Sequence, residues 1–264
     1  MSQEQSFEGY RALVLPLIEE GLREAVDGED LQHLYQYVVD GGKRLRPTLT
    51  LLVADALGGD RAVALDLACS AELTHCASLC LDDILDGHGE RRGKTALHLA
   101  GDLRQAVTTG FTLPSVALNL AARHGAAPTQ TLSEAWVSMC LGVYLEEAPE
   151  TVSWDAYQRN IELKTGRLFA AASAFGALAS GQDGESFYRY GLHLGNAFQM
   201  ADDLQDGWEG TWHLTWHPRL QRRMRAEIRQ AEEEAATWEG GQVELLHLLR
   251  RTPRDLLDLK EAVP

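Results

Sequence analysis

The sequence has 264 residues, is 45% hydrophobic and contains only eight prolines, so it can form one sizeable core. Its formal net charge of −15 argues against nucleic acid as a partner. No apolar stretch reaches the ~18 uninterrupted residues typical of a transmembrane helix. The N-terminus lacks a basic region followed by an apolar run, so no signal peptide is expected. We therefore expect a soluble, cytoplasmic protein.

Nearly every segment has the periodicity of a helix, and no hairpin signals recur. The expected helices span residues 5–25, 29–40, 44–57, 61–86, 100–123, 131–148, 154–180, 184–206 and 219–238. We expect the Trp-, Gly- and His-rich piece 207–218 to be irregular and short helices to follow residue 238. No linker or domain boundary is evident. The sequence thus predicts one all-α domain over residues 1–264, a single large helical bundle.

Two clusters of the form D-D-x-x-D, at residues 82–86 and 202–206, lie in apolar surroundings 120 positions apart. Residues four apart share a helix face, so Asp82 and Asp86 project together, as do Asp202 and Asp206. Either cluster alone can be an exposed acidic turn. Two clusters in apolar stretches favour a site where carboxylates and substrate phosphates share Mg²⁺ ions.

Basic residues that suit a phosphorylated ligand accompany these clusters. Lys43 and Arg46 follow a glycine pair, and Arg91-Arg92 follows the first aspartate cluster by five residues. Taken singly, each of these features has a simpler interpretation. The K-R-x-R run is typical of a solvated helix face, and His75 is typical of a histidine in a protein core. The role of Lys164 is ambiguous when it is considered alone. Together they indicate two anion sites beside two metal sites.

The sequence resembles the trans-isoprenyl diphosphate synthases of the polyprenyl synthetase family, in particular those that make geranylgeranyl diphosphate. The matching pieces are G-G-K-R-L-R-P at 41–47, D-D-I-L-D at 82–86, R-R-G-K at 91–94, K-T-G at 164–166 and F-Q-M-A-D-D-L-Q-D at 198–206. The resemblance implies an isoprenoid synthase bundle with a central active-site cavity and a homodimer. It also implies that an allylic diphosphate is condensed head to tail with isopentenyl diphosphate, using about three Mg²⁺ ions.

The resemblance also implies roles for individual residues. The metal ligands would be Asp82, Asp86, Asp202 and Asp206. The catalytic set would be Asp82, Asp83, Asp86, Lys164 and Asp202. The allylic diphosphate would contact Arg91, Lys164, Thr165 and Gln199. Isopentenyl diphosphate would contact Lys43, Arg46, His75 and Arg92.

Product length is expected to depend on the helix before the first cluster. The residues one to three turns before Asp82 are small or modest: Ala71, Thr74, Ala77 and Ser78. Synthases of short products carry bulky aromatic residues just before this motif, so we expect a deep tunnel and a product of geranylgeranyl length or longer. Alternatively, small residues here only allow close helix packing. Phe111 and Trp136 are candidates for plugging the tunnel from other helices.

The sequence departs from the family after the second cluster. No lysine occurs between Lys164 and Lys260, and the segment 207–213 is shortened where the family carries lysine-bearing loops. Thr109-Gly110-Phe111 stands where the family has a Gly-Asp segment. The alternative is a non-catalytic or regulatory subunit of a heteromeric synthase, although the intact aspartate clusters favour catalysis. A class I terpene cyclase would not need the segment 41–47.

Overall fold

Helices make up nearly all of the regular structure in the computed structural model, which describes residues 6–146, 153–205 and 211–261. The first half comprises α1 (Phe7–Ala25), α2 (Gln32–Val39), α3 (Leu45–Leu57), α4 (Arg61–Leu85), β1 (Glu90–Arg91), β2 (Lys94–Thr95), α5 (Leu97–Ala100) and α6 (Leu103–Ala122). The second half comprises α7 (Ala126–Tyr144), α8 (Trp154–Ile161), a π-helical segment (Glu162–Gly166), α9 (Arg167–Leu178), α10 (Glu185–Gln205), α11 (Thr211–Ala236) and α12 (Val243–Glu261). The all-α prediction is confirmed.

Four helices begin at side chains that cap free backbone N–H groups. Ser6, Asp102 and Ser153 each accept a hydrogen bond from the amide three residues on, and Asp60 accepts from the amides two and three residues on. Gly58 ends α3 in the left-handed conformation, with φ of 69°. These local signals explain why several helix ends match the sequence-based prediction closely.

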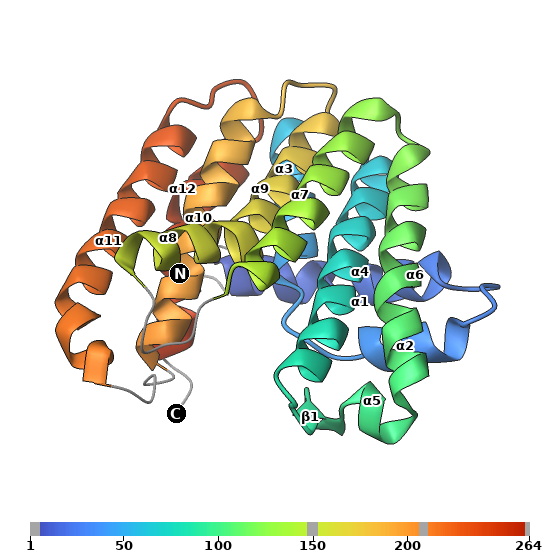
Figure 1. Ribbon diagram of the computed structural model, residues 1–264. Helices are drawn as coiled ribbons and strands as arrows, with labels where there is room; N and C mark the ends of the chain where they lie inside the picture. The colour runs from blue at the N-terminus through green and yellow to red at the C-terminus, as the bar shows by residue number, and fades with distance from the viewer. Residues whose placement is uncertain (1–5, 147–152, 206–210, 262–264) are drawn as a thin grey trace.

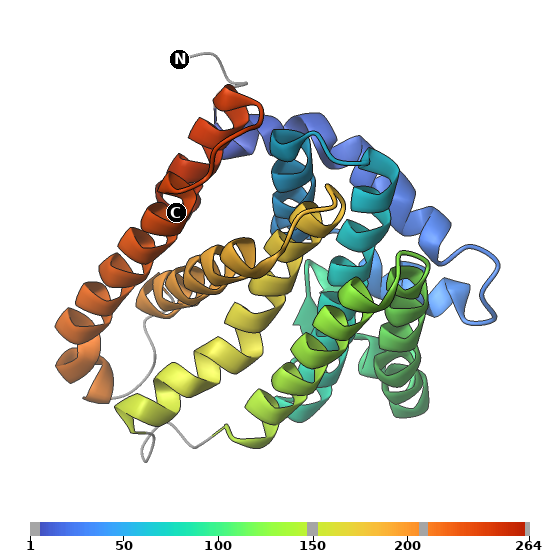
Figure 2. The same cartoon turned by 90° about the horizontal axis from the view of Figure 1, so that it is seen from above.

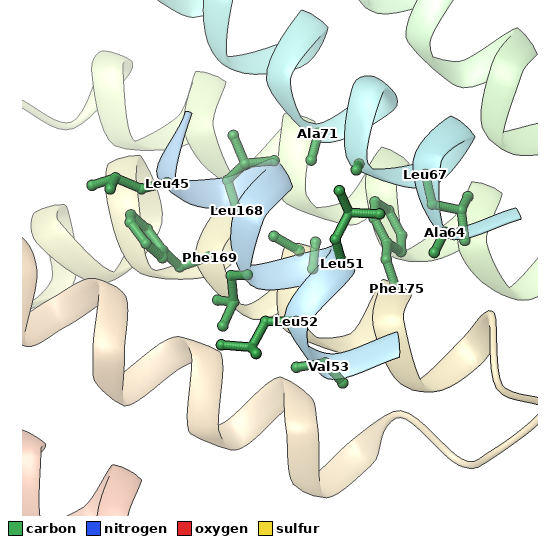
Figure 3. Packing of buried hydrophobic residues seen from close by; sticks show 14 of the residues in the cluster. Leu45, Leu51, Leu52, Val53, Ala64, Leu67, Ala71, Leu168, Phe169 and Phe175 are labelled. Atoms are coloured by element: carbon green, nitrogen blue, oxygen red, sulfur yellow. The ribbon is translucent and has the colours of Figure 1, made fainter. Parts of the chain in front are cut away.

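The core lies around α3, which packs between α4 and α9. In Figure 1 most of the long helices run side by side, and Figure 2 shows α1 along one edge of the molecule. Leu51, Leu52, Leu67, Leu168 and Phe175 are at most 1% exposed and meet in the interior (Figure 3). This packing fixes α4, which carries the first aspartate cluster, against the helices that carry the rest of the cavity.

Glycines allow α9 to approach its neighbours closely. A Cβ on Gly176 would lie 2.5 Å from the carbonyl oxygen of Thr50 in α3. One on Gly191 of α10 would lie 2.4 Å from the carbonyl oxygen of Phe169 in α9. Both neighbours are backbone atoms, so these two contacts require glycine.

The structure corrects three expectations about local structure. Helix α11 begins at Thr211 and includes Pro218, although the sequence predicted an irregular piece up to that proline. Beyond α11 the chain forms one long helix, α12, in place of several short ones. The loop after the first cluster contains a small hairpin, β1–β2, whose turn places Arg92 and Gly93 at positive φ.

Two further features concern α4 and its cysteines. Among the described residues, α4 alone has the length and hydropathy of a membrane-spanning helix, but most of it is buried inside the protein. Cys69, Cys76 and Cys80 are free thiols buried in the interior. Cys140 is also free but exposed.

Candidate active site

A cavity of about 550 Å³ opens between the segment before α3, α4, the β1–β2 turn, α8, the π-helical segment and α10. Along α4 the cavity wall follows one stripe of the helix, formed by Glu72, His75, Leu79 and Asp82 and continued by Asp86 at the C-cap, with Ser78 beside it. These positions alternate in steps of three and four, which keeps them on one face. The face is acidic at its C-terminal end and meets basic residues toward its other end.

Four aspartates of the two clusters line this cavity: Asp82, Asp86, Asp202 and Asp203. Asp82 lies on α4 and Asp86 at its C-cap, and the two project together as their i, i+4 spacing predicted. Asp202 and Asp203 come from α10. Asp206 lies outside the described residues. Burial raises the pKa of Asp82, although Lys164 acts against this. Within the described ranges, no three His, Cys, Asp or Glu side chains form a ready-made metal site. Asp82, Asp86 and Asp202 offer carboxylate oxygens, the ligands that Mg²⁺ accepts alongside water and phosphate.

The middle aspartate of each cluster holds a neighbouring side chain. Asp83 is 3% exposed, does not border this cavity and accepts hydrogen bonds at 2.8 and 2.5 Å from Arg91. Asp203 is 6% exposed and accepts hydrogen bonds from Tyr157 at 2.5 Å and from Gln199 at 2.9 Å. Asp83, predicted among the catalytic residues, is thus placed to orient Arg91.

The π-helical segment brings Lys164 and Thr165 to the cavity beside Asp82. Lys164 donates a hydrogen bond to Glu146 at 2.7 Å, and Thr165 donates one to Gln199 at 2.9 Å. Burial acts to lower the pKa of Lys164, but Glu146 and Asp82 outweigh it and the pKa is raised. A Cβ on Gly142 of α7 would lie 2.7 Å from Cγ of Lys164, so this glycine makes room for the lysine.

The predicted isopentenyl diphosphate residues gather at the basic end of the cavity. Lys43, Arg46, His75 and Arg92 all line it. Arg46 is 9% exposed, stacks over the ring of Phe169 at 4.5 Å, and has a buried Nε without a hydrogen-bond partner. Burial lowers the pKa of Arg46 to about 10, and burial with the nearby arginines lowers that of His75. A cavity-lining arginine with an unpartnered buried nitrogen suits an anionic ligand.

The predicted chain-length residues are only partly at the cavity. Ser78 lines it, but Ala71, Thr74 and Ala77 are at most 1% exposed and border neither cavity described here. Ala71 and Ala77 belong to the packed core, where small side chains let neighbouring helices come close. Figure 3 shows Ala71 among the core residues around α3. Phe111, predicted to plug the tunnel, is 68% exposed on the surface of the part of the chain that the structure describes.

A second, smaller pocket of about 160 Å³ adjoins the main cavity at Ser78, Asp82 and Lys164. It lies between α4 and α7, and its remaining wall consists of Leu81, Leu85, Trp136, Met139, Cys140 and Val143. This pocket is apolar and begins beside the aspartates. Trp136, predicted as a plug, lies in its wall.

Sequence reasoning missed several residues that line the cavity. Glu72 shares the α4 stripe with His75 and Asp82, so helical spacing would have found it. Tyr157 and Glu146 carry no such signal, because their contacts with Asp203 and Lys164 join distant parts of the chain. Arg44 was passed over within the K-R-x-R run, although it is fully buried.

Comparison with known proteins places this site in a family. The sequence profile of the family described as Polyprenyl synthetase matches residues 29–212. The chain belongs to the polyprenyl synthetase family. The match includes both aspartate clusters, Lys43, Arg46 and the K-T-G segment.

Relatives in the family include geranylgeranyl diphosphate synthases. The chain is 39% identical to one from Cereibacter sphaeroides over 181 residues, which cover 64% of this chain and 62% of that protein. It is 36% identical to another from Methanosarcina mazei over 191 residues, covering 67% of this chain and 59% of that protein. The chain thus spans less than two thirds of the length of these relatives.

The fold of the polyprenyl synthetase chain also matches solved structures. It is similar to a geranyltranstransferase from Thermotoga maritima, with a TM-score of 0.83 and 26% identity, over 94% of this chain and 99% of that one. The similarity therefore extends beyond the residues matched by the sequence profile, into α11 and α12.

Proposed function

We propose that this polyprenyl synthetase is a Mg²⁺-dependent prenyltransferase of isoprenoid biosynthesis that condenses an allylic diphosphate with isopentenyl diphosphate. The observation that supports this proposal most strongly is that one cavity is lined by Asp82, Asp86 and Asp202 and also by the cations Arg46 and Arg92. Such an arrangement accommodates two diphosphates, one bound through metal and one bound through cations alone.

The residues of the cavity suit these two ways of binding a diphosphate. Asp82, Asp86 and Asp202 would hold Mg²⁺, and Lys164 with Arg91 would contact the allylic diphosphate beside it. Bound Mg²⁺ would supply charge stabilisation for the departing diphosphate. Lys164 keeps its positive charge because of Glu146 and Asp82, so it adds to that stabilisation.

The isopentenyl diphosphate would occupy the basic end, where Arg46 and Arg92 neutralise its charge. The allylic C–O bond breaks, and its electron pair leaves with the diphosphate. The double bond of isopentenyl diphosphate then attacks the allylic cation, and the released diphosphate takes the final proton. His75 is a poor proton donor here, since burial and neighbouring arginines lower its pKa.

The aspartates provide the direct test of this reaction. We expect Asp82→Ala and Asp202→Ala to lower kcat by at least about 100-fold, because each removes a ligand to charge-stabilising metal. Asp30→Ala serves as the matched control, because Asp30 is exposed and outside the cavity. The measurement is conversion of labelled isopentenyl diphosphate with an allylic primer. Turnover that survives both cavity substitutions would contradict the proposal.

For product length, we propose that the small apolar pocket receives the growing chain. It adjoins the main cavity at Asp82, and the indole of Trp136 occupies part of its wall. The product would be geranylgeranyl diphosphate or longer. Trp136→Ala would enlarge the pocket, so we expect longer products by chromatography. Glu134→Ala is the control, because Glu134 lies on the same helix but outside the pocket. An unchanged product length in Trp136→Ala would contradict this assignment.

We further propose a homodimer that works in the cytoplasm. Helix α7 exposes Val137, Leu141 and Tyr144, which share a stripe at i, i+4 and i+7, and the neighbouring α6 exposes Leu103 and Phe111. A second copy of the chain would bury this apolar surface. The free cysteines suit a reducing compartment.

A further inference from the structure

Glu72 is a buried acid at the basic end of the cavity, where the proposed function places an anion. It lies on α4, is 2% exposed and borders the cavity. A carboxylate at this place repels a diphosphate and is costly to bury unless cations surround it. Its retention there calls for a specific role.

Two arginines from separate segments converge on this carboxylate. Arg44 donates a hydrogen bond from Nη1 to Glu72 at 2.8 Å, and Nη2 of Arg92 lies 3.6 Å from the same oxygen. Arg44 precedes α3, whereas Arg92 lies in the β1–β2 turn. Glu72 therefore links the two segments that supply the cations at the basic end of the cavity.

Arg44 is fully engaged in this link and is not offered to a ligand. It is 1% exposed, adopts a positive φ of 52°, and also donates hydrogen bonds to Glu19 and to the carbonyl of Val39. Its fixed position holds the following turn of chain, which carries Arg46 into the cavity.

Arg92 is packed tightly against the glycine pair. Its Nη1 donates a hydrogen bond to the carbonyl of Gly41 at 2.9 Å. A Cβ on Gly42 would lie 2.7 Å from Cζ of Arg92, so only glycine leaves room for the guanidinium. The glycine carbonyl and Glu72 together fix where the charge of Arg92 lies.

We propose that Glu72 is a positioning residue for isopentenyl diphosphate: it aligns Arg92 directly and Arg46 through Arg44. This inference rests on the proposed function. Lys43, Arg44, Arg46 and Arg92 carry four positive charges at this end of the cavity, and the carboxylates of Glu72 and Glu19 offset two of them. The remaining excess positive charge binds the diphosphate. Because Glu72 holds Arg44 and Arg92 in place, the positions of these arginines are set before the ligand binds.

Glu72→Gln tests the role, because glutamine keeps the size of the side chain and removes its charge. We expect isopentenyl diphosphate to bind about 10- to 100-fold more weakly, the range expected when a hydrogen bond to a charged group is lost. Binding is measured by calorimetry without Mg²⁺. The KM of the allylic diphosphate is expected to stay within about twofold, because its proposed ligands lie at the other end of the cavity. Equal or tighter binding of isopentenyl diphosphate would overturn the proposal, since it would show that Glu72 acts mainly by repulsion.

Glu19→Gln is the matched control. Glu19 binds the same Arg44 at 2.7 Å, but it is 40% exposed and does not border the cavity. We expect it to weaken isopentenyl diphosphate binding by less than about threefold, as exposed ion pairs contribute little. If Glu19→Gln weakened isopentenyl diphosphate binding as much as Glu72→Gln does, the effect would come only from the anchoring of Arg44. That result would overturn the proposal that Glu72 aligns Arg92 directly.

Circular dichroism shows whether Glu72→Gln is folded. If it is not, a second variant provides the test. Glu72→Asp retains the charge and shortens the reach by one methylene, so an intermediate loss of affinity is expected. An unchanged affinity in that variant would overturn the proposal. If the unaltered protein itself binds no isopentenyl diphosphate, the proposed function fails. If it binds and Glu72→Gln binds equally, only the present inference fails.

Discussion

At the scale of single residues, the cavity sets the charge of each ionisable group through its neighbours. His75 illustrates this, because it borders the cavity at its basic end. Burial, followed by the positive charges of Arg46 and Arg92, lowers its pKa well below the usual value. The histidine is therefore neutral in the folded protein at neutral pH and adds no charge to the anion site.

This neutral histidine predicts a dependence of stability on pH. The unfolded protein binds a proton at His75 below about pH 6.5 while the folded protein does not, so acid favours unfolding. The sign follows from the lowered folded pKa: the free energy of unfolding rises with pH up to about 6.5, by up to about 1.4 kcal/mol per pH unit from this group.

The measurement is urea unfolding of the unaltered protein and of His75→Gln at about pH 7 and about pH 5.5. We expect the unaltered protein to lose more stability on acidification than the variant. Comparing the two removes the contribution of all other groups. The same loss in both proteins would mean that His75 takes up a proton equally in the folded and unfolded states.

At the scale of elements, glycines decide how closely α9 packs against its neighbours. Gly176→Ala would place a methyl group 2.5 Å from the carbonyl oxygen of Thr50, so one backbone must move. Overpacking of this kind costs about 1–3 kcal/mol, which exceeds the ~1 kcal/mol gained from better helix propensity. We expect a lower free energy of unfolding by chemical denaturation.

Gly21→Ala is the control for this prediction. A methyl group there would lie 3.0 Å from Sγ of Cys69 and 3.1 Å from Leu65, both side chains that can shift. Its stability is expected to stay within about 1 kcal/mol of the unaltered protein. A Gly176→Ala protein as stable as the Gly21→Ala protein would show that α3 and α9 are not in rigid contact.

The helices that the sequence predicted well are those with local signals. Ser153 caps the start of α8, and Gly58 ends α3. The predicted start of α11 was wrong because contacts with residues far away in the sequence override the local propensity there. Trp216 packs edge-on against Trp154 at 5.4 Å and against Tyr157 at 5.9 Å, and neither contact has a signature in the local sequence.

The sequence predicted those parts of the site in which helix periodicity places residues on one face. Asp82 and Asp86 share a face by spacing, and the structure places them in one cavity with Asp202. The spacing does not show which side of a helix meets a cavity and which meets the core. Ala71 and Ala77 consequently lie in the core, although they precede the cluster by three turns or fewer.

At the scale of the whole molecule, the proposed dimer depends on the apolar face of α6 and α7. Phe111 is 68% exposed and Tyr144 is 83% exposed, so aspartate at these positions should not disturb the folded chain. We expect the double variant Phe111→Asp, Tyr144→Asp to sediment as a monomer in analytical ultracentrifugation, because it buries charges in an apolar interface. A dimer that survives would place the interface elsewhere.

The central claim is that this chain, spanning less than two thirds of its relatives' length, is itself a catalyst. The most direct measurement incubates the purified chain alone with Mg²⁺, labelled isopentenyl diphosphate and dimethylallyl, geranyl or farnesyl diphosphate in turn. We predict elongated prenyl diphosphates, separated by chromatography, without any partner protein. No product from any primer, despite binding of isopentenyl diphosphate, would contradict the account and identify a subunit that supports a catalytic partner.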